Sequence, residues 1–79
     1  MTIGKDEITK LFADFFSKQL NQTFNENLKI QDVEGFDSLA MVDLSIEFEE
    51  AFDVALNLDT FKSATYLKDV IDEVVKRVN

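Results

Sequence analysis

The chain has no cysteine, no histidine and no proline, and it has only two glycines among its 79 residues. Without cysteine it can form neither a disulfide framework nor a thiolate metal site. Without histidine it lacks the commonest general base and the commonest metal ligand. No apolar run approaches the roughly 18 residues of a membrane span, and the first residues lack the basic-then-apolar order of a signal peptide. We therefore expect a cytoplasmic protein with no catalytic residues, no bound metal and no membrane span.

The length and the composition predict one small folded domain over residues 1–79. Hydrophobic residues make up 46% of the chain, including eight phenylalanines, which is far above the composition of a disordered segment. A chain of this length buries only about 60% of its unfolded surface, so we expect a thin core.

Positive charge is missing from one long segment. From Ile30 to Phe61 the sequence has nine carboxylates and no Lys or Arg, while the rest of the chain is close to neutral, so the net charge of −8 is local. A one-signed field of this kind favours steering toward a basic partner. It argues against nucleic acid, which needs Lys and Arg to neutralise its phosphates.

Apolar residues recur at helical spacing through most of the chain, without the alternation of a strand. We expect helices over about Lys5–Leu20, from Asp37 or Ser38 to Phe52, and over about Thr65–Val78, with a short turn or single-turn helix in 57–64. Asp37 is suited to cap the second helix because its carboxylate can accept from free amides of the first turn. Three main helices and one short one predict an all-α, four-helix bundle that remains a monomer.

A long connection without clear periodicity, residues 21–35, separates the first two helices. Loops of this length are unusual in a small domain and are often functional. Four apolar residues are expected to hold it against the core: Phe24, Leu28, Ile30 and Val33. Thr65 is expected to cap the last helix.

The second helix carries two apolar faces. Successive residues of a helix are rotated by about 100° about its axis. With this rotation, four apolar residues share the face expected to point into the core: Met41, Leu44, Phe48 and Phe52. Leu39, Val42 and Ile46 fall on nearly the opposite side, bordered by Asp43, Glu47 and Glu50. This second stripe either packs on the long connection or the last helix, or forms a docking strip for a basic-rimmed groove. Each of its side chains would contribute about 1.5–3 kcal/mol if buried, which favours a transient interface.

Ser38 is poorly equipped to act as an enzymatic nucleophile. A serine hydroxyl needs a nearby base, the chain has no histidine, and the nearest lysines in sequence are Lys29 and Lys62. The sequence of residues 35–39 is also not a nucleophile elbow. The alternative from the residues alone is that Ser38 helps Asp37 to cap the helix start.

The order of these features resembles the acyl carrier proteins over nearly the whole chain. The resemblance rests on Asp37-Ser38-Leu39 at a helix start, on the acids that follow, and on Glu49-Glu50-Ala51-Phe52-Asp53 at the helix end. It implies that Ser38 accepts a 4′-phosphopantetheine arm from a phosphopantetheinyl transferase (a holo-ACP synthase), and that the arm's thiol carries acyl groups as thioesters. It also implies that Asp37 helps to bind the transferase's metal.

The same resemblance assigns roles in partner binding. Leu39, Val42 and Ile46 match apolar docking positions of the family. Asp43, Glu47 and Glu50 match acids that meet Arg and Lys on basic patches of acyl-loading and acyl-processing enzymes.

Several positions depart from the family's pattern. Phe36 stands where a small residue is frequent, so it could shade the attachment site or touch the arm. Ala40 and Met41 make the helix start less charged, and Asn57 replaces a frequent proline. The abundant phenylalanines could reshape the acyl cavity, and the candidate lining residues are Phe12, Phe16, Phe48, Phe52 and Phe61.

These departures leave the pathway open between fatty-acid biosynthesis in lipid metabolism, polyketide synthesis and related specialised acyl synthesis. Two alternatives remain: an aminoacyl or peptidyl carrier, and an unmodified acidic helical adaptor for a basic partner. A calcium-binding protein is disfavoured because the acids lack the alternation and the central glycine of an EF-hand loop.

Overall fold

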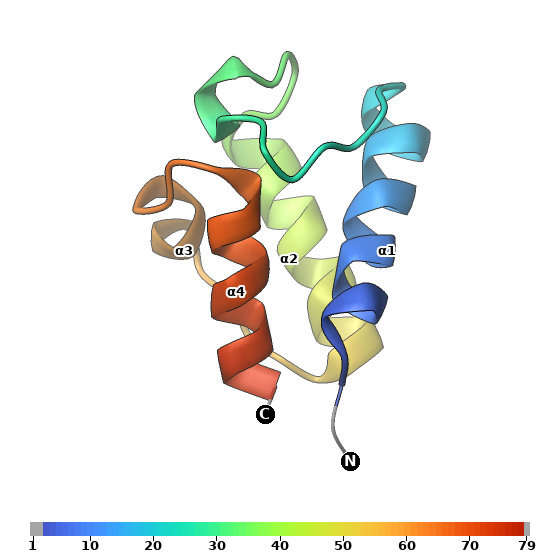
Figure 1. Cartoon of the computed structure of the whole chain (residues 1–79), viewed down its shortest axis with the longest axis vertical. Helices are drawn as coiled ribbons and strands as arrows, with labels where there is room; N and C mark the ends of the chain where they lie inside the picture. The colour runs from blue at the N-terminus through green and yellow to red at the C-terminus, as the bar shows by residue number, and fades with distance from the viewer. Residues whose placement is uncertain (1–2, 79) are drawn as a thin grey trace.

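The computed structural model describes residues 3–78, and within them four α-helices pack into a bundle (Figure 1). The helices are α1 (Lys5–Phe15), α2 (Ser38–Phe52), α3 (Leu58–Lys62) and α4 (Leu67–Val78). The connection between α1 and α2 crosses one end of the bundle, above the start of α2. The predicted all-α bundle is therefore confirmed for the described residues.

The first predicted helix changes its hydrogen-bonding pattern near its end. α1 is followed by a π-helical turn, Phe16–Leu20, and the chain leaves this turn through Asn21 at φ 54°. Asparagine is one of the few residues that adopt left-handed backbone readily, so it can end the helix here without glycine. At the other end, the Gly4 N–H donates to the Glu7 carboxylate at 3.1 Å.

Phenylalanine rings form a continuous chain of contacts through the core. Their order in space is Phe52, Phe48, Phe12, Phe24, Phe16, Phe36 and Phe61, with neighbouring ring centroids 5.1–6.0 Å apart. Such pairs contribute about 0.5–1.5 kcal/mol each beyond the burial of area. The chain of rings joins α1, its π-helical turn, the long connection, α2 and α3. The buried aliphatic side chains of α4 belong to the same core cluster as the rings: Leu67, Val70, Ile71 and Val74.

Backbone hydrogen bonds fasten the long connection to the start of α4. The Leu67 N–H donates to the Leu28 carbonyl at 3.0 Å, and the Lys68 N–H donates to the Glu26 carbonyl at 2.9 Å. The Ile30 N–H donates back to the Thr65 carbonyl at 2.9 Å. Two amides of the first turn of α4, which have no partner within the helix, are thus satisfied by the connection. We call these three bonds the backbone clasp.

Two expectations about these segments need correction. The Leu28 side chain is exposed, so this residue is held through its carbonyl oxygen and not through apolar packing. α4 begins at Leu67, so the residue before it is Tyr66 and not Thr65, and the Tyr66 N–H donates to the Asp69 carboxylate at 3.1 Å. The other predicted anchors are in place, because Ile30 and Val33 are buried and Phe24 contacts two other rings.

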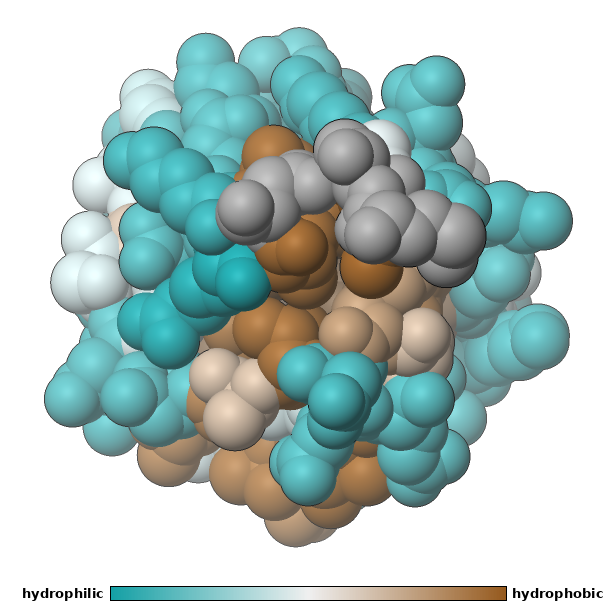
Figure 2. All heavy atoms as spheres, turned by 90° about the horizontal axis from the view of Figure 1, so that it is seen from below, coloured by the Kyte–Doolittle hydropathy of each residue, from teal (hydrophilic) through white to brown (hydrophobic). Residues whose placement is uncertain are grey.

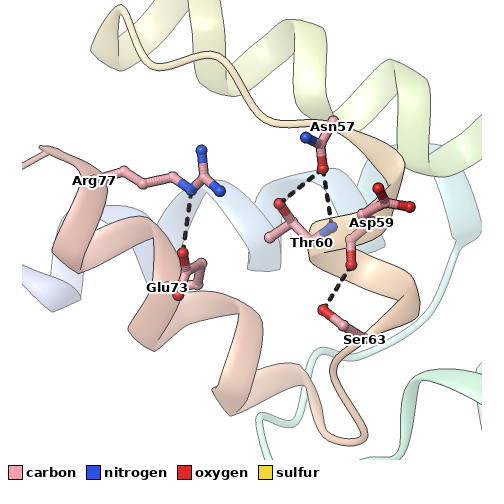
Figure 3. A network of polar contacts seen from close by, with 6 residues as sticks. All are labelled: Asn57, Asp59, Thr60, Ser63, Glu73 and Arg77. Carbon is pink, nitrogen blue, oxygen red and sulfur yellow. Dashed lines mark hydrogen bonds and ion pairs between the residues drawn. The ribbon is translucent and has the colours of Figure 1, made fainter.

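Asn57 caps the short helix α3. Its Oδ1 accepts from the Thr60 N–H at 3.2 Å and from the Thr60 hydroxyl at 3.3 Å (Figure 3). The Ser63 hydroxyl at the end of α3 donates to the Asp59 carbonyl at 2.7 Å. The asparagine that departs from the family's pattern therefore has a local structural role, which a proline could not perform because it has no side-chain acceptor.

The end of the bundle where α1 begins and α4 ends shows apolar surface between polar side chains (Figure 2). α2 begins at the opposite end, under the long connection. Within residues 3–78, no helix is long and apolar enough to cross a membrane.

The backbone conformation at the end of α2 predicts that the protein can be stabilised by a substitution at Asp53. Asp53 follows the helix at φ 55°, a conformation that aspartate tolerates better than most residues but that glycine adopts without a side-chain penalty, and its negative charge lies at the negative end of the helix dipole. Asp53→Gly should raise the free energy of unfolding by about 1 kcal/mol. Urea denaturation will measure this as a higher midpoint with an unchanged slope.

Asp53→Asn is the matched control for this prediction. It removes the charge but keeps a side chain on the left-handed backbone, so its gain should be smaller than that of Asp53→Gly. A glycine variant that is no more stable than the wild type would contradict the strain argument.

Candidate functional site

Ser38 is the first residue of α2, and its side chain is exposed. Asp37 precedes it as the N-cap, with its Oδ1 accepting from the Ala40 N–H at 3.0 Å. The predicted cap is therefore confirmed. The cap fixes the direction of the first turn, so the Ser38 hydroxyl is presented on a rigid helix start and not on a free loop.

Two residues fix the turn before Ser38, one through its backbone conformation and one through its buried side chain. Gly35 adopts φ 80°, a conformation that other residues rarely take, and this lets the chain turn into the helix. Phe36 is only 6% exposed, and its ring lies 5.6 Å from Phe16 and 6.0 Å from Phe61. Phe36 thus anchors the segment in the core while Asp37 and Ser38 remain at the surface.

The second apolar stripe of α2 faces solvent. Leu39 is 71% exposed, Val42 40% and Ile46 47%, whereas the core face of the same helix is buried at Met41, Leu44 and Phe48. Packing of this stripe on the long connection or on α4 is therefore excluded as its explanation. We call Leu39, Val42 and Ile46 the apolar strip.

The acids beside the apolar strip are also exposed. Asp43, Glu47 and Glu50 lie on the same helix, and none of them takes part in the two ion pairs found within residues 3–78, Lys5–Glu26 and Glu73–Arg77. Their charges are therefore available to a partner. In the same described range, no group of three or more acids is arranged to hold a metal ion.

A pocket of about 470 Å³ lies between the long connection, the first turn of α2 and α3. Its buried wall consists of Ile30, Phe36, Met41 and Phe61. Its exposed edge carries Gln31, Lys62 and Thr65. Because Phe36 and Met41 lie within three residues of Ser38 in the chain, the pocket is close to the start of α2.

The five residues predicted to line an acyl cavity do not lie together in the structure. Phe61 lines the pocket described above, and Phe52 lines a different one between α1 and α2. Phe12, Phe16 and Phe48 line neither of these pockets and lie within the ring chain of the core.

The sequence prediction missed the polar edge of the pocket. Lys62 is the only Lys or Arg between Lys29 and Lys68, which is the signal that could have marked it. Gln31 and Thr65 gave no signal of their own, because only the fold brings them to the same opening as Lys62.

A small bundle that presents a serine at its surface, without a histidine to activate it, has the form of a carrier domain on which another protein acts. The family model described as the phosphopantetheine attachment site matches residues 6–74. The chain therefore belongs to the phosphopantetheine-binding carrier proteins, and its covalent cofactor is 4′-phosphopantetheine.

A solved structure supports the same assignment. The chain is similar to the crystal structure of an acyl carrier protein from Thermotoga maritima, at 25% sequence identity and a TM-score of 0.72, over 94% of this chain and 89% of that chain. No curated protein sequence matches the chain. Carrier proteins of this kind are modified by a phosphopantetheinyl transferase and work with partner enzymes.

The exposed acids of α2 generate a prediction about charge. Glu50 lies three residues after Glu47 and three before Asp53, and each like-charged pair costs about 0.2–0.5 kcal/mol. Glu50→Gln should therefore raise the melting temperature at low salt by a few degrees, and added NaCl or Mg²⁺ should raise that of the wild type. Circular dichroism melts at several salt concentrations will measure both effects.

Asp14→Asn is the control, because it also removes one negative charge. Asp14 is an exposed residue with Lys10 four residues before it and Lys18 four residues after it, so removing its charge should not raise the melting temperature. A wild-type melting temperature that does not respond to salt would contradict the repulsion argument.

Proposed function

We propose that this protein is an acyl carrier protein, in which Ser38 bears the 4′-phosphopantetheine arm and helix α2 presents the cargo to partner enzymes. The observation that carries the proposal is the exposed Ser38 at the capped start of α2, with the apolar strip on the same helix and the pocket beside its first turn. When bound, the arm supplies a thiol that holds acyl groups as thioesters. This explains how a chain without cysteine takes part in thiol chemistry.

In the proposed attachment step, the Ser38 hydroxyl oxygen forms a phosphodiester with the pantetheine phosphate of coenzyme A, and adenosine 3′,5′-bisphosphate leaves. The hydroxyl proton passes to a base of the transferase, since this chain supplies no histidine. Asp37 then has two compatible tasks. One carboxylate oxygen caps α2 through Ala40, and the carboxylate also helps to bind the transferase's metal ion.

Partner recognition is proposed to use two physical effects on one helix. Asp43, Glu47 and Glu50 attract basic patches of the transferase and of acyl-loading and acyl-processing enzymes, which raises association rates. The apolar strip of Leu39, Val42 and Ile46 then loses its contact with water, which slows dissociation. Because only three apolar side chains are involved, the complexes are expected to be short-lived.

The chain itself is proposed to be a non-catalytic, monomeric cytoplasmic carrier, with residues 1–79 as one domain. The acyl group would use the pocket between α2 and α3, where Phe36 and Met41 provide apolar contact and the fully buried Phe61 closes the wall behind them. The cargo pathway remains either fatty-acid or polyketide synthesis or a related specialised route. An aminoacyl or peptidyl carrier is the alternative within the same family, and an unmodified adaptor is the alternative without the arm.

Intact mass spectrometry tests the attachment site. Incubation with coenzyme A and a promiscuous phosphopantetheinyl transferase should add one phosphopantetheinyl group to the wild type and none to Ser38→Ala. Ser63→Ala is a control, because it removes another exposed hydroxyl, at the end of α3, and this variant should gain the phosphopantetheinyl group like the wild type. A wild type that gains no mass would leave the unmodified adaptor as the better explanation.

The docking surface makes a second prediction, with the same transferase as the probe. Truncating two partly exposed members of the apolar strip in Val42→Ala/Ile46→Ala should lower its affinity by at least tenfold, mainly through faster dissociation. Glu47→Lys should instead slow association, and this effect should shrink as salt is added. Surface plasmon resonance at two salt concentrations separates the two rates.

Leu28→Ala is the control for the apolar strip. Leu28 is also an exposed large hydrophobic residue, at 36%, but it lies on the long connection and outside α2. Equal losses of affinity for the strip variant and for Leu28→Ala would rule out a specific docking role for the strip.

A further inference from the structure

The pocket beside Ser38 differs from a deep apolar tunnel in two ways. Its inner wall is closed by packed aromatic rings, and its outer edge is polar and carries a positive charge. Both properties bear on the acyl group that this chain can shelter.

The inner wall is closed by Phe36 and Phe61. Phe61 has no exposed surface, and its ring lies 6.0 Å from that of Phe36 in an edge-on arrangement. Phe36 in turn packs on Phe16 at 5.6 Å, so the wall continues into the ring chain of the core. An alkyl chain that extends beyond this wall must separate these rings. Inserting atoms into a packed core forces side chains from their preferred rotamers and is destabilising.

The outer edge offers polar contacts instead. Gln31 carries an amide, Thr65 a hydroxyl and Lys62 an ammonium group, and all three side chains are exposed. Lys62 takes part in neither of the two ion pairs found within residues 3–78. Lys62 is also the only basic residue between Lys29 and Lys68. The nine acidic residues of this segment would otherwise repel an anionic group.

We infer that this carrier shelters short acyl groups with a polar or carboxylate end, which lie along the wall formed by Phe36 and Met41 with their far end near Lys62, and that it leaves long alkyl chains largely exposed. The inference rests on the proposed function, because it requires cargo on Ser38. It deepens that function by naming the class of cargo. Phe36 and Phe61 limit the length of the group, and Lys62 favours a negative charge at its far end.

The first experiment varies chain length. The transferase loads Ser38 with butanoyl, hexanoyl, octanoyl and dodecanoyl pantetheine, and the melting temperature of each form is compared with that of the form bearing the bare arm. In the wild type the gain in melting temperature should rise over the shorter members and stop rising before dodecanoyl. In Phe61→Leu the gain should continue to longer chains, because the shorter side chain opens the wall.

Two further variants secure the interpretation. Phe36→Leu opens the same wall from the other side and should also extend the length limit, which keeps the test decisive if Phe61→Leu does not fold. Phe52→Leu is the matched control, because Phe52 lines the separate pocket between α1 and α2 and its loss should leave the limit unchanged. A wild-type gain that rises through dodecanoyl, or a limit that neither wall variant extends, would overturn the length argument.

The second experiment varies charge at constant length. At low salt, the wild type loaded with adipoyl, which ends in a carboxylate, should gain several degrees more than the hexanoyl form. Lys62→Gln should abolish this difference, and Lys18→Gln, which removes an exposed lysine of the π-helical turn, should retain it. An adipoyl form no more stable than the hexanoyl form, or a difference that survives Lys62→Gln, would refute the role of Lys62.

The proposed function and the cargo inference can be contradicted separately. Loading is verified by intact mass before any melt, so a wild type that gains no pantetheinyl group contradicts the proposed function. A loaded protein with the wrong dependence on length or charge contradicts only the cargo inference.

Discussion

Contact between phenylalanine rings is the interaction on which the rest of this structure depends. Seven of the eight phenylalanines form one continuous series, from Phe52 at the end of α2 to Phe61 in α3. A domain this small buries little surface, and without cysteine it has no covalent alternative. Large rings supply much buried area per residue and prefer defined relative orientations. They therefore give a thin core both its stability and its fixed geometry.

The same rings border the proposed site, so stability and function share residues. Phe36 belongs to the core through Phe16, lines the pocket, and stands two residues before Ser38. Its burial holds the helix start in place while Asp37 and Ser38 remain exposed. A carrier with a small residue at this position would have more room beside its arm, and it would need another anchor for the turn. In this chain the aromatic residue supplies the anchor and reduces the space.

The sequence predicted what depends on neighbours along the chain. Helical periodicity identified the bounds of α2, the Asp37 cap and the exposed strip, because each follows from spacing within one helix. Leu28 could not be predicted correctly, since its role depends on an amide of Leu67, a residue far away in sequence. Thr65 failed as a cap for a related reason: its carbonyl is used by Ile30, and α4 begins two residues later. The closed and charged walls of the pocket likewise exist only after α3 has packed against the long connection.

The backbone clasp has a consequence for how this protein can diverge in evolution. Its three hydrogen bonds join only main-chain atoms of the long connection and of the start of α4. Glu26 and Leu28 contribute only their carbonyl groups to the clasp, so a change of either side chain leaves its three bonds intact, although a change at Glu26 also removes the ion pair with Lys5. Proline is excluded where an amide donates, as at Ile30 and Lys68. The connection beside the cargo pocket can therefore accumulate substitutions that alter its surface, while the path of its backbone across the bundle is preserved.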